Sequence, residues 1–274
     1  QAIYNRNGKR LGTRAVFTAI DEDFRAGSGF ISRPGVVRAA VTQRFSFFGK
    51  KGGALEVLNT DVVLDGNWKY RAFFGEGGVQ DKKLHINNNA TLRGGWKAGA
   101  SVLIESFGYE PDLYVNYFLP AATSGAFTPY VGLPRLPNLD WVLSLTTPEF
   151  KRFSGYVNAL WGKDENFFEW SSANIAYVTV RLDWRPTEKL RLNTTYNLQQ
   201  FKRRSDGSLV GRRQIPRLKL EYQATRAIFG RLIAEYDARF QDTLRDDSRT
   251  NLPIFIRDAT GSFTRALASR RNGL

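Results

Sequence analysis

Carboxylates and a single histidine are the side chains that could carry out chemistry in this chain of 274 residues, because it contains no cysteine and no methionine. The missing cysteine excludes disulfides, thiolate metal sites and cysteine nucleophiles, and one histidine excludes a cage of several histidines around a metal. That residue, His85, would need an orienting partner and a nucleophile to act as a catalytic base, and the sequence around it shows neither. We therefore predict an ordinary place for His85 on a polar strand face.

Facing carboxylates can hydrolyse glycosides when they lie roughly 5–10 Å apart. Glu221, Glu235 and Asp237 fall on neighbouring predicted strands, but each has an arginine or lysine beside it. Ion pairing is the simpler interpretation of these neighbours. The acidic clusters at residues 164–165 and 246–247 lack the alternating ligand spacing of a calcium loop. We predict that the protein is not an enzyme and that it holds no metal and no cofactor.

The elements that would position these groups are two β-hairpins, which alternation of side-chain character predicts from residue 175 onward. The first hairpin pairs residues 176–184 with 190–200 around a proline-bearing turn, and the second pairs 216–224 with 229–240. One face of all four strands carries no charge, whereas about half of the opposite face is charged. Such alternation predicts strands whose two faces meet different surroundings.

Strand length and connector length both favour a membrane β-barrel. The predicted strands run about ten to twelve residues, which matches the roughly 9–11 residues that cross a bilayer at a tilt and exceeds the ~5–6 typical of soluble sheets. Short turns within the hairpins alternate with polar connectors of roughly a dozen residues, at 201–213 and 241–253. No apolar run of about 18 residues is present, which excludes a helical membrane span. We predict an all-β fold, an antiparallel transmembrane β-barrel.

Earlier segments repeat the alternation less regularly. Apolar residues recur at every second position in residues 37–47, 84–92 and 96–104, with 68–74, 113–117 and 155–161 as further candidates. These segments bring the predicted total to roughly ten to fourteen strands. Residues 1–33 are irregular and predict a lead-in or plug segment, whereas residues 34–274 supply the barrel strands and loops. The proline-rich stretch 120–137 predicts a long loop or an inward-folded constriction.

Two stretches carry a resemblance to a known family: residues 21–33 (DEDFRAGSGFISR) and the turn at 184–190 (WRPTEKL) with its flanking hairpin. They resemble the uncharacterised bacterial outer-membrane β-barrels that follow a family-nine carbohydrate-binding module, and the likeness covers most of this chain as the barrel portion. The resemblance implies a location in the bacterial outer membrane and no assigned reaction. No such module lies upstream here, and the C-terminal residues lack the strand ending in an aromatic residue that the family has. We expect an incomplete segment of a larger barrel.

The charged strand face would then line the lumen, and its cationic majority would favour anions. The residues predicted to line the lumen are Arg181, Asp183, Arg191, Arg217, Lys219, Glu221, Arg231, Glu235, Asp237 and Arg239. A second set, the cationic residues of one predicted surface loop, comprises Lys202, Arg203, Arg204, Arg212 and Arg213.

The net charge of +14 bears on the partners of such a loop. Its cations predict contact with the phosphates of outer-membrane lipid and lipopolysaccharide, and an ordinary solvated loop is the alternative. Nucleic acid is not expected as a partner, because the aromatic residues lie on the apolar stripe rather than among the basic ones.

Two other functions remain open on the sequence. A secreted soluble β-sandwich that binds polysaccharide would show the same alternation, because soluble antiparallel sheets also have an apolar and a polar face. An outer-membrane hydrolase with its site at the barrel mouth is the second. Aromatic residues near strand ends, such as Trp184 and Tyr222, favour the membrane. We predict a non-enzymatic barrel that acts as a channel, a scaffold or a carbohydrate-linked uptake component, with any polysaccharide bound through the absent N-terminal module.

Overall fold

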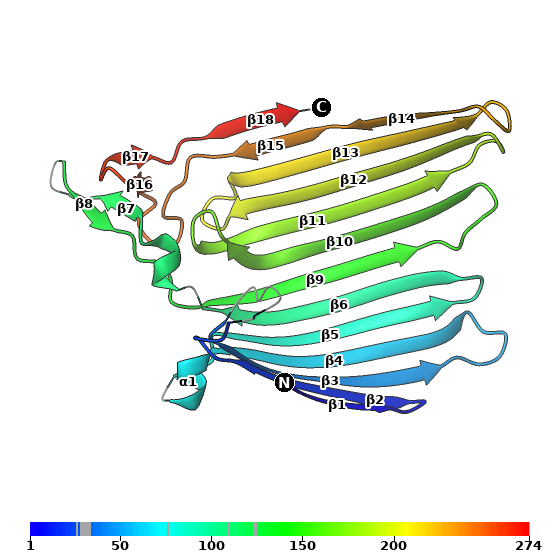
Figure 1. Cartoon of the computed structure of the whole chain (residues 1–274), viewed down its shortest axis with the longest axis horizontal. Coiled ribbons are helices and arrows are strands. Elements are labelled where there is room, and N and C mark those ends of the chain that lie inside the picture. The colour runs from blue at the N-terminus through cyan, green and yellow to red at the C-terminus, as the bar shows by residue number, and fades with distance from the viewer. Residues whose placement is uncertain (26, 28–33, 76, 109, 123–124, 274) are drawn as a thin grey trace.

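One large antiparallel sheet dominates the computed structural model, which describes residues 1–25, 27, 34–75, 77–108, 110–122 and 125–273 (Figure 1). Almost all neighbours in the sheet are also neighbours along the chain. In spatial order its strands are β1 (Ala2–Asn7), β2 (Leu11–Ile20), β3 (Val36–Phe48), β4 (Leu55–Lys69), β5 (Asp81–Leu92), β6 (Trp96–Phe107), β9 (Leu136–Thr146), β10 (Phe153–Asn166), β11 (Ser171–Trp184), β12 (Leu190–Arg203), β13 (Leu209–Gln223), β15 (Asp237–Gln241) and β18 (Ser269–Gly273), with β14 (Phe229–Glu235) also paired to β13.

A second, small sheet lies at one end of the large one (Figure 1). Its strands, in spatial order, are β17 (Phe263–Arg265), β16 (Phe255–Arg257), β7 (Tyr117–Pro120) and β8 (Phe127–Pro129). The helical elements are α1 (Tyr70–Phe74) and the 3-10 turn η1 (Pro111–Tyr114). Within the described residues, no helix has the length and apolar character needed to cross a membrane.

The two ends of the large sheet have different connections (Figure 1). At the end that we call the short-turn end, the connections are residues 8–10, 49–54, 93–95, 147–152, 185–189 and 224–228. At the opposite, long-loop end they include 21–35, 70–80, 108–135 and 242–268, besides the tight turns 167–170 and 204–208. The predicted long connector at 201–213 is therefore wrong in its bounds, because β12 and β13 extend into it.

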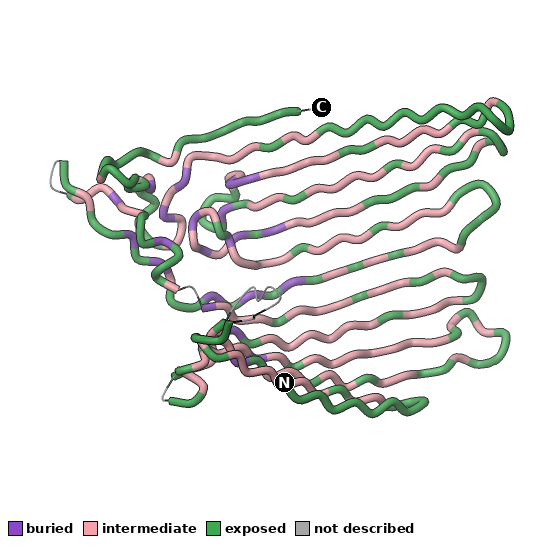
Figure 2. The backbone as a smooth tube through the Cα atoms, viewed as in Figure 1, coloured by how far each residue is buried: buried purple, intermediate pink, exposed green. Residues whose placement is uncertain are grey.

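Period-two geometry gives the large sheet one polar and one apolar face. Leu192 of β12 pairs with Leu220 of β13, which pairs in turn with Leu232 of β14. Leu182 of β11 lies on the same face and is 43% exposed, and Leu232 is 58% exposed. The described residues form no second layer over this face, and Figure 2 shows the body of the sheet as intermediate or exposed.

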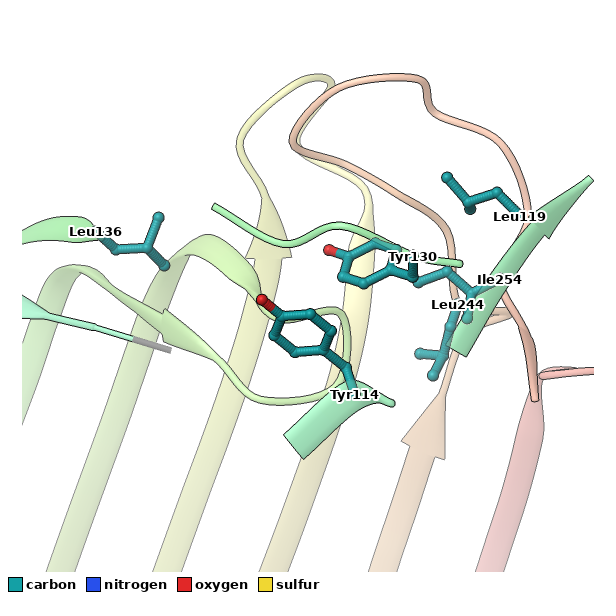
Figure 3. Close-up of a cluster of buried hydrophobic side chains, with 6 residues drawn as sticks. All are labelled: Tyr114, Leu119, Tyr130, Leu136, Leu244 and Ile254. Carbon is teal, nitrogen blue, oxygen red and sulfur yellow. The ribbon is translucent and has the colours of Figure 1, made fainter. Parts of the chain in front are cut away.

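The buried core lies at the long-loop end instead, where the purple residues gather in Figure 2. It is a cluster that brings the loop 108–135 against the loop 242–268, and Figure 3 draws its members, Tyr114, Leu119, Tyr130, Leu136, Leu244 and Ile254. The Tyr130 hydroxyl donates a hydrogen bond of 2.7 Å to the backbone oxygen of Glu169. The two long loops therefore form one packed cap, held to the turn 167–170.

Several predicted elements are confirmed. The hairpins β11–β12, β13–β14 and β5–β6 form as expected, and β5–β6 turns through Gly94 and Gly95 at φ +82° and +86°, values that favour glycine. The strand predicted at 155–161 lies within β10, and the strand predicted at 37–47 lies within β3.

Other predictions are wrong. Residues 2–7 and 11–20 form β1 and β2 rather than an irregular plug, and residues 26 and 28–33 of that predicted segment lie outside the described residues. Residues 70–74 form α1, and residues 111–114 form η1, where we predicted strands. Alternation over so few residues fits a single helical turn as well as a strand, and Phe74 and Leu113 are 63% and 50% exposed rather than buried on one face.

Candidate functional site

The candidate site is the polar face of the large sheet. The strand register places all ten residues predicted to line a lumen on this one face, on β11 to β15. Thr195 of β12, for example, pairs with Arg181 of β11 and with Arg217 of β13, and Arg217 pairs with Glu235 of β14. Side chains separated widely in the sequence thus form rows across the strands, within reach of cross-strand ion pairs.

Three carboxylates on this face are each shared between two cations. Asp183 accepts hydrogen bonds from Arg185 Nε at 3.0 Å and from Arg191 Nε at 2.9 Å. Asn193 donates to the same carboxylate at 2.6 Å. Because one anion serves two guanidinium groups, each such group of three keeps a net positive charge.

The second and third carboxylates repeat this arrangement. Glu221 lies 2.9 Å from Lys219 Nζ and 3.0 Å from Arg231 Nη2. Asp237 lies 2.8 Å from Arg213 Nη2 and 2.6 Å from Arg239 Nη2. Pairing therefore occupies these carboxylates, as the sequence indicated.

Arg181 and Arg217 carry positive charge that is less neutralised. The Arg181 guanidinium lies 5.4 Å from the centre of the Tyr156 ring, a cation–π contact that leaves its charge in place. Arg217 Nε lies 3.7 Å from Glu235 Oε2, beyond hydrogen-bond distance, and both side chains are half exposed. The polar face of β11 to β15 therefore has an excess of cations.

The N-terminal half of the sheet has its own ion pairs, which sequence reasoning missed. Arg44 Nε lies 2.7 Å from Asp61 Oδ1, and Lys83 Nζ lies 3.0 Å from Glu105 Oε2. Glu105 also contacts His85 Nε2 at 2.5 Å, so this histidine does have a carboxylate partner. The partner lies 20 residues away on the next strand, where no local pattern could reveal it.

The prediction that Arg203 belongs to a cationic surface loop is wrong. Arg203, the last residue of β12, is buried, and its Nη2 lies 2.5 Å from Glu169 Oε1 in the turn 167–170. Its Nη1 donates to Asp242 Oδ2 at 2.7 Å. Arg203 is an internal anchor for the cap, because a buried guanidinium needs carboxylates and carbonyls around it.

The other four members of that set do not form one patch. Lys202 lies in β12, and Arg212 and Arg213 lie in β13, whereas Arg204 lies in the turn 204–208. Arg213 points to the polar face and pairs with Asp237, whereas Arg212 pairs in register with Phe240 on the apolar face. Only Lys202 and Arg204 are exposed among them.

The sequence also did not reveal that several acidic residues of β9 and β10 lie together near the long-loop end. Asn138 of β9 donates from Nδ2 to Asp164 Oδ1 at 3.0 Å and to Glu165 Oε1 at 2.7 Å. Asp140, also of β9, is 2% exposed. Within the described part of the chain no three histidine, cysteine or acidic residues are arranged to hold a metal ion. The arrangement is a hydrogen-bonded junction between β9 and β10 rather than a metal centre.

The fold and the site define an all-β protein whose dominant sheet has one charged and one uncovered apolar face. Comparison with known protein families, with curated proteins and with solved structures finds no match for this chain.

Proposed function

We propose that the large sheet is the membrane-crossing wall of a bacterial outer-membrane β-barrel, with the apolar face against lipid and the polar face toward a water-filled interior. The observation that carries this proposal is the uncovered apolar face, since a soluble protein of this size would bury such a surface under another layer. In β11 this face runs from Ala176 to Trp184, about 26 Å at 3.3 Å per residue. With barrel strands tilted by about 35–45°, that length spans roughly 19–22 Å of the ~25 Å apolar band of membrane barrels.

The distribution of charge on the apolar face supports the proposal. The charged residues of β2 to β13 that fall on this face near the long-loop end are the four cations Lys82, Lys163, Lys202 and Arg212 and the carboxylate Glu165, and each lies within four residues of that end of its strand. Long cationic side chains at such positions can extend to a headgroup region, whereas a charge at the bilayer centre is costly.

Aromatic residues form a belt at the short-turn end of the same face. The members of this aromatic belt, each within three residues of a strand end, are Phe47, Trp96, Phe153, Trp184 and Tyr222. Phe153 and Trp184 are direct register partners on β10 and β11. Aromatic girdles at this height mark the interface between hydrocarbon and headgroups in membrane barrels.

The neutral polar side chains on the apolar face bind one another across strands. Thr60 donates to Asn88 at 2.7 Å, and Asn88 donates to the backbone oxygen of Ala100 at 3.3 Å. Thr13 donates to Gln43 at 2.8 Å. A polar group in contact with hydrocarbon needs such a partner, because water is not available to it.

A complete wall also requires its two edges to pair, because unpaired edge groups are costly in lipid. Within the described residues the sheet is open, with β1 at one edge and β18 at the other. Both edge strands run from the long-loop end toward the short-turn end. A strand that closed the wall by antiparallel pairing with both edges would run in the opposite direction.

The polar face then sets what passes or binds inside. Its three carboxylates are each shared by two cations, and Arg181 and Arg217 add further positive charge. A lumen with this balance favours anionic solutes. We infer a non-enzymatic protein of the outer membrane, a channel or scaffold whose interior prefers anions, with outer-membrane lipid and lipopolysaccharide around it.

Fractionation of the protein expressed in a Gram-negative bacterium tests this function. We expect the protein in the outer-membrane fraction and its release by detergent alone. Recovery from the periplasm without detergent would overturn the proposal and favour the secreted polysaccharide-binding protein. For the hydrolase alternative, the joint substitution Glu235→Gln and Asp237→Asn should leave any measured glycoside hydrolysis unchanged, and a loss of rate with intact folding would contradict a non-enzymatic protein.

A further inference from the structure

A pocket of about 630 Å³ opens at the short-turn end, between the turns 147–152 and 185–189 and the ends of β12 and β13. Its charged lining residues are mostly cations, namely Lys151, Arg152, Arg185, Lys189 and Arg191, against the carboxylates Glu188 and Glu221. Four of these cations, Lys151, Arg152, Arg185 and Lys189, lie on the two neighbouring turns and outside the predicted lumen and loop sets, to which only Arg191 and Glu221 of the charged lining belong.

Two carboxylates at the pocket are already committed to cations, whereas Glu188 forms no ion pair within the described residues. Glu221 binds Lys219 and Arg231, and Asp183 binds both Arg185 and Arg191. Arg185 and Arg191 share the single carboxylate of Asp183, so an incoming anion could bind them without breaking an ion pair that serves one cation alone.

Three cations of the pocket form no ion pair with a carboxylate within the described residues. Lys151 and Arg152 form no ion pair within the part of the chain that the structure describes. Lys189 donates from Nζ to the backbone oxygen of Ala224 at 3.2 Å, a contact that leaves its positive charge uncompensated. The pocket thus holds surplus positive charge on two different turns.

A backbone hydrogen bond joins the two turns, and a side-chain bond braces one of them. The Arg185 N–H donates to the backbone oxygen of Arg152 at 2.6 Å, which joins the turn 185–189 to the turn 147–152. Within the turn 185–189, Thr187 Oγ1 accepts from the N–H of Leu190 at 3.0 Å. The cations are therefore presented from a braced backbone, which lowers the entropy lost when an anion binds between them.

We propose that this pocket binds a phosphate group. Arginine presents a planar fork of donors that matches phosphate oxygens, and lysine adds a point charge. A phosphate with up to two negative charges suits the surplus of cations better than a single carboxylate does. Two sources offer this group: a soluble phosphorylated solute entering from the short-turn side, or the headgroup of an anionic phospholipid beside the aromatic-belt residues Trp184 and Tyr222.

The test compares the native protein with the double variant Lys151→Ala/Arg152→Ala in detergent. A matched control, Lys50→Ala/Lys51→Ala, removes the same charge from the exposed turn 49–54 at the same end of the sheet, outside the pocket. One arm titrates inorganic phosphate against chloride at matched ionic strength. The other arm measures retention of phosphatidylglycerol against phosphatidylcholine by native mass spectrometry.

We expect saturable binding of at least one probe, weakened roughly tenfold by the pocket variant and unchanged by the control. Phosphate binding identifies a soluble ligand, and selective retention of phosphatidylglycerol alone identifies a lipid headgroup. Equal weakening by both double variants, or no saturable binding of either probe, would overturn the proposal. Because the phosphate arm needs only the folded turns, it fails or succeeds separately from the proposed membrane location.

Discussion

Arg203 and Glu169 form an ion pair that is closed off from solvent, with side chains 1% and 0% exposed and Nη2 2.5 Å from Oε1. The pair joins the end of β12 to the turn 167–170 across 34 residues of chain. Glu169 also accepts a hydrogen bond from the N–H of Arg245 at 3.0 Å, so one carboxylate holds a strand end and the cap loop 242–268 together. Burial raises the pKa of Glu169, and its bonds to Arg203 oppose that rise.

The substitution Glu169→Gln should destabilise the cap, because it leaves the buried Arg203 guanidinium without its closest counter-ion. We expect a loss of about 3–5 kcal/mol in the free energy of unfolding, measured by denaturant titration in detergent. The control Asp242→Asn removes the other carboxylate on Arg203, which is 37% exposed, and should cost about 0–1 kcal/mol. Similar losses for the two variants would show that the Glu169 pair does not anchor the cap.

The substitution Val180→Arg should impair folding into lipid vesicles, because Val180 lies midway along the apolar stretch of β11 from Ala176 to Trp184 and is 40% exposed. A cation near the bilayer midplane costs about 2–4 kcal/mol in a barrel. Thr179→Arg, the preceding residue of β11 on the polar face, is the control and should fold normally. The quantity to measure is the folded fraction in vesicles by gel mobility. Tolerance of Val180→Arg would argue against contact of this face with lipid.

The pair Thr60 and Asn88 should behave as a unit within the apolar face. Asn88→Leu alone leaves the Thr60 hydroxyl without its acceptor and should cost roughly 1–2 kcal/mol of folding free energy. The double variant Thr60→Val/Asn88→Leu removes both polar groups and should recover most of that loss. A double-mutant cycle measures the coupling energy. If the double variant were as unstable as the two single losses added together, the two side chains would not depend on each other.

Ion selectivity should follow the unneutralised cations of the polar face. Arg181→Glu combined with Arg217→Glu should lower the anion-to-cation permeability ratio several-fold in planar bilayers, because both charges project from the face proposed to line the lumen. Lys51→Glu, on a turn at the sheet end, should leave the ratio unchanged. An unaltered ratio in the double variant would place these arginines outside the conduction path.

Acid should release the turn 204–208 from the cap only at low pH. A side-chain hydrogen bond from Arg245, with further bonds from Ser208, holds the pKa of Asp206 well below its usual value. A carboxyl group whose folded pKa is depressed stabilises the fold above its unfolded pKa of about 3.9, and that contribution is lost as the pH falls through the folded value.

Pepsin digestion of the loop 242–268 between pH about 5 and about 2 measures this release. We expect the native loop to resist until well below pH ~4, whereas Asp206→Asn, which lacks the charge at every pH, should be cut throughout the range. The reverse order, with the variant more resistant than the native protein, would contradict a role for this contact.

The alternation along β11 to β14 was readable from the sequence because a strand points successive side chains to opposite sides, which is a local rule. It predicted which residues share a face, as with Arg181 and Arg217, and which carboxylates are paired, as with Asp237. The same rule failed at residues 11–20. In β2, Val16 and Ile20 put apolar side chains on the otherwise polar face, which blurs the alternation.

Tertiary structure alone decided two further features. The burial of Arg203 depends on Glu169 and Asp242, which approach it only after β11, β12 and β13 have aligned and the loop 242–268 has folded back. The absence of a second layer over Leu182 within the described residues is likewise a property of the assembled sheet. The amino-acid sequence therefore determined the two faces, because side-chain direction follows residue by residue. Which residues lie buried at the cap depends on contacts between distant segments, and these exist only in the folded chain.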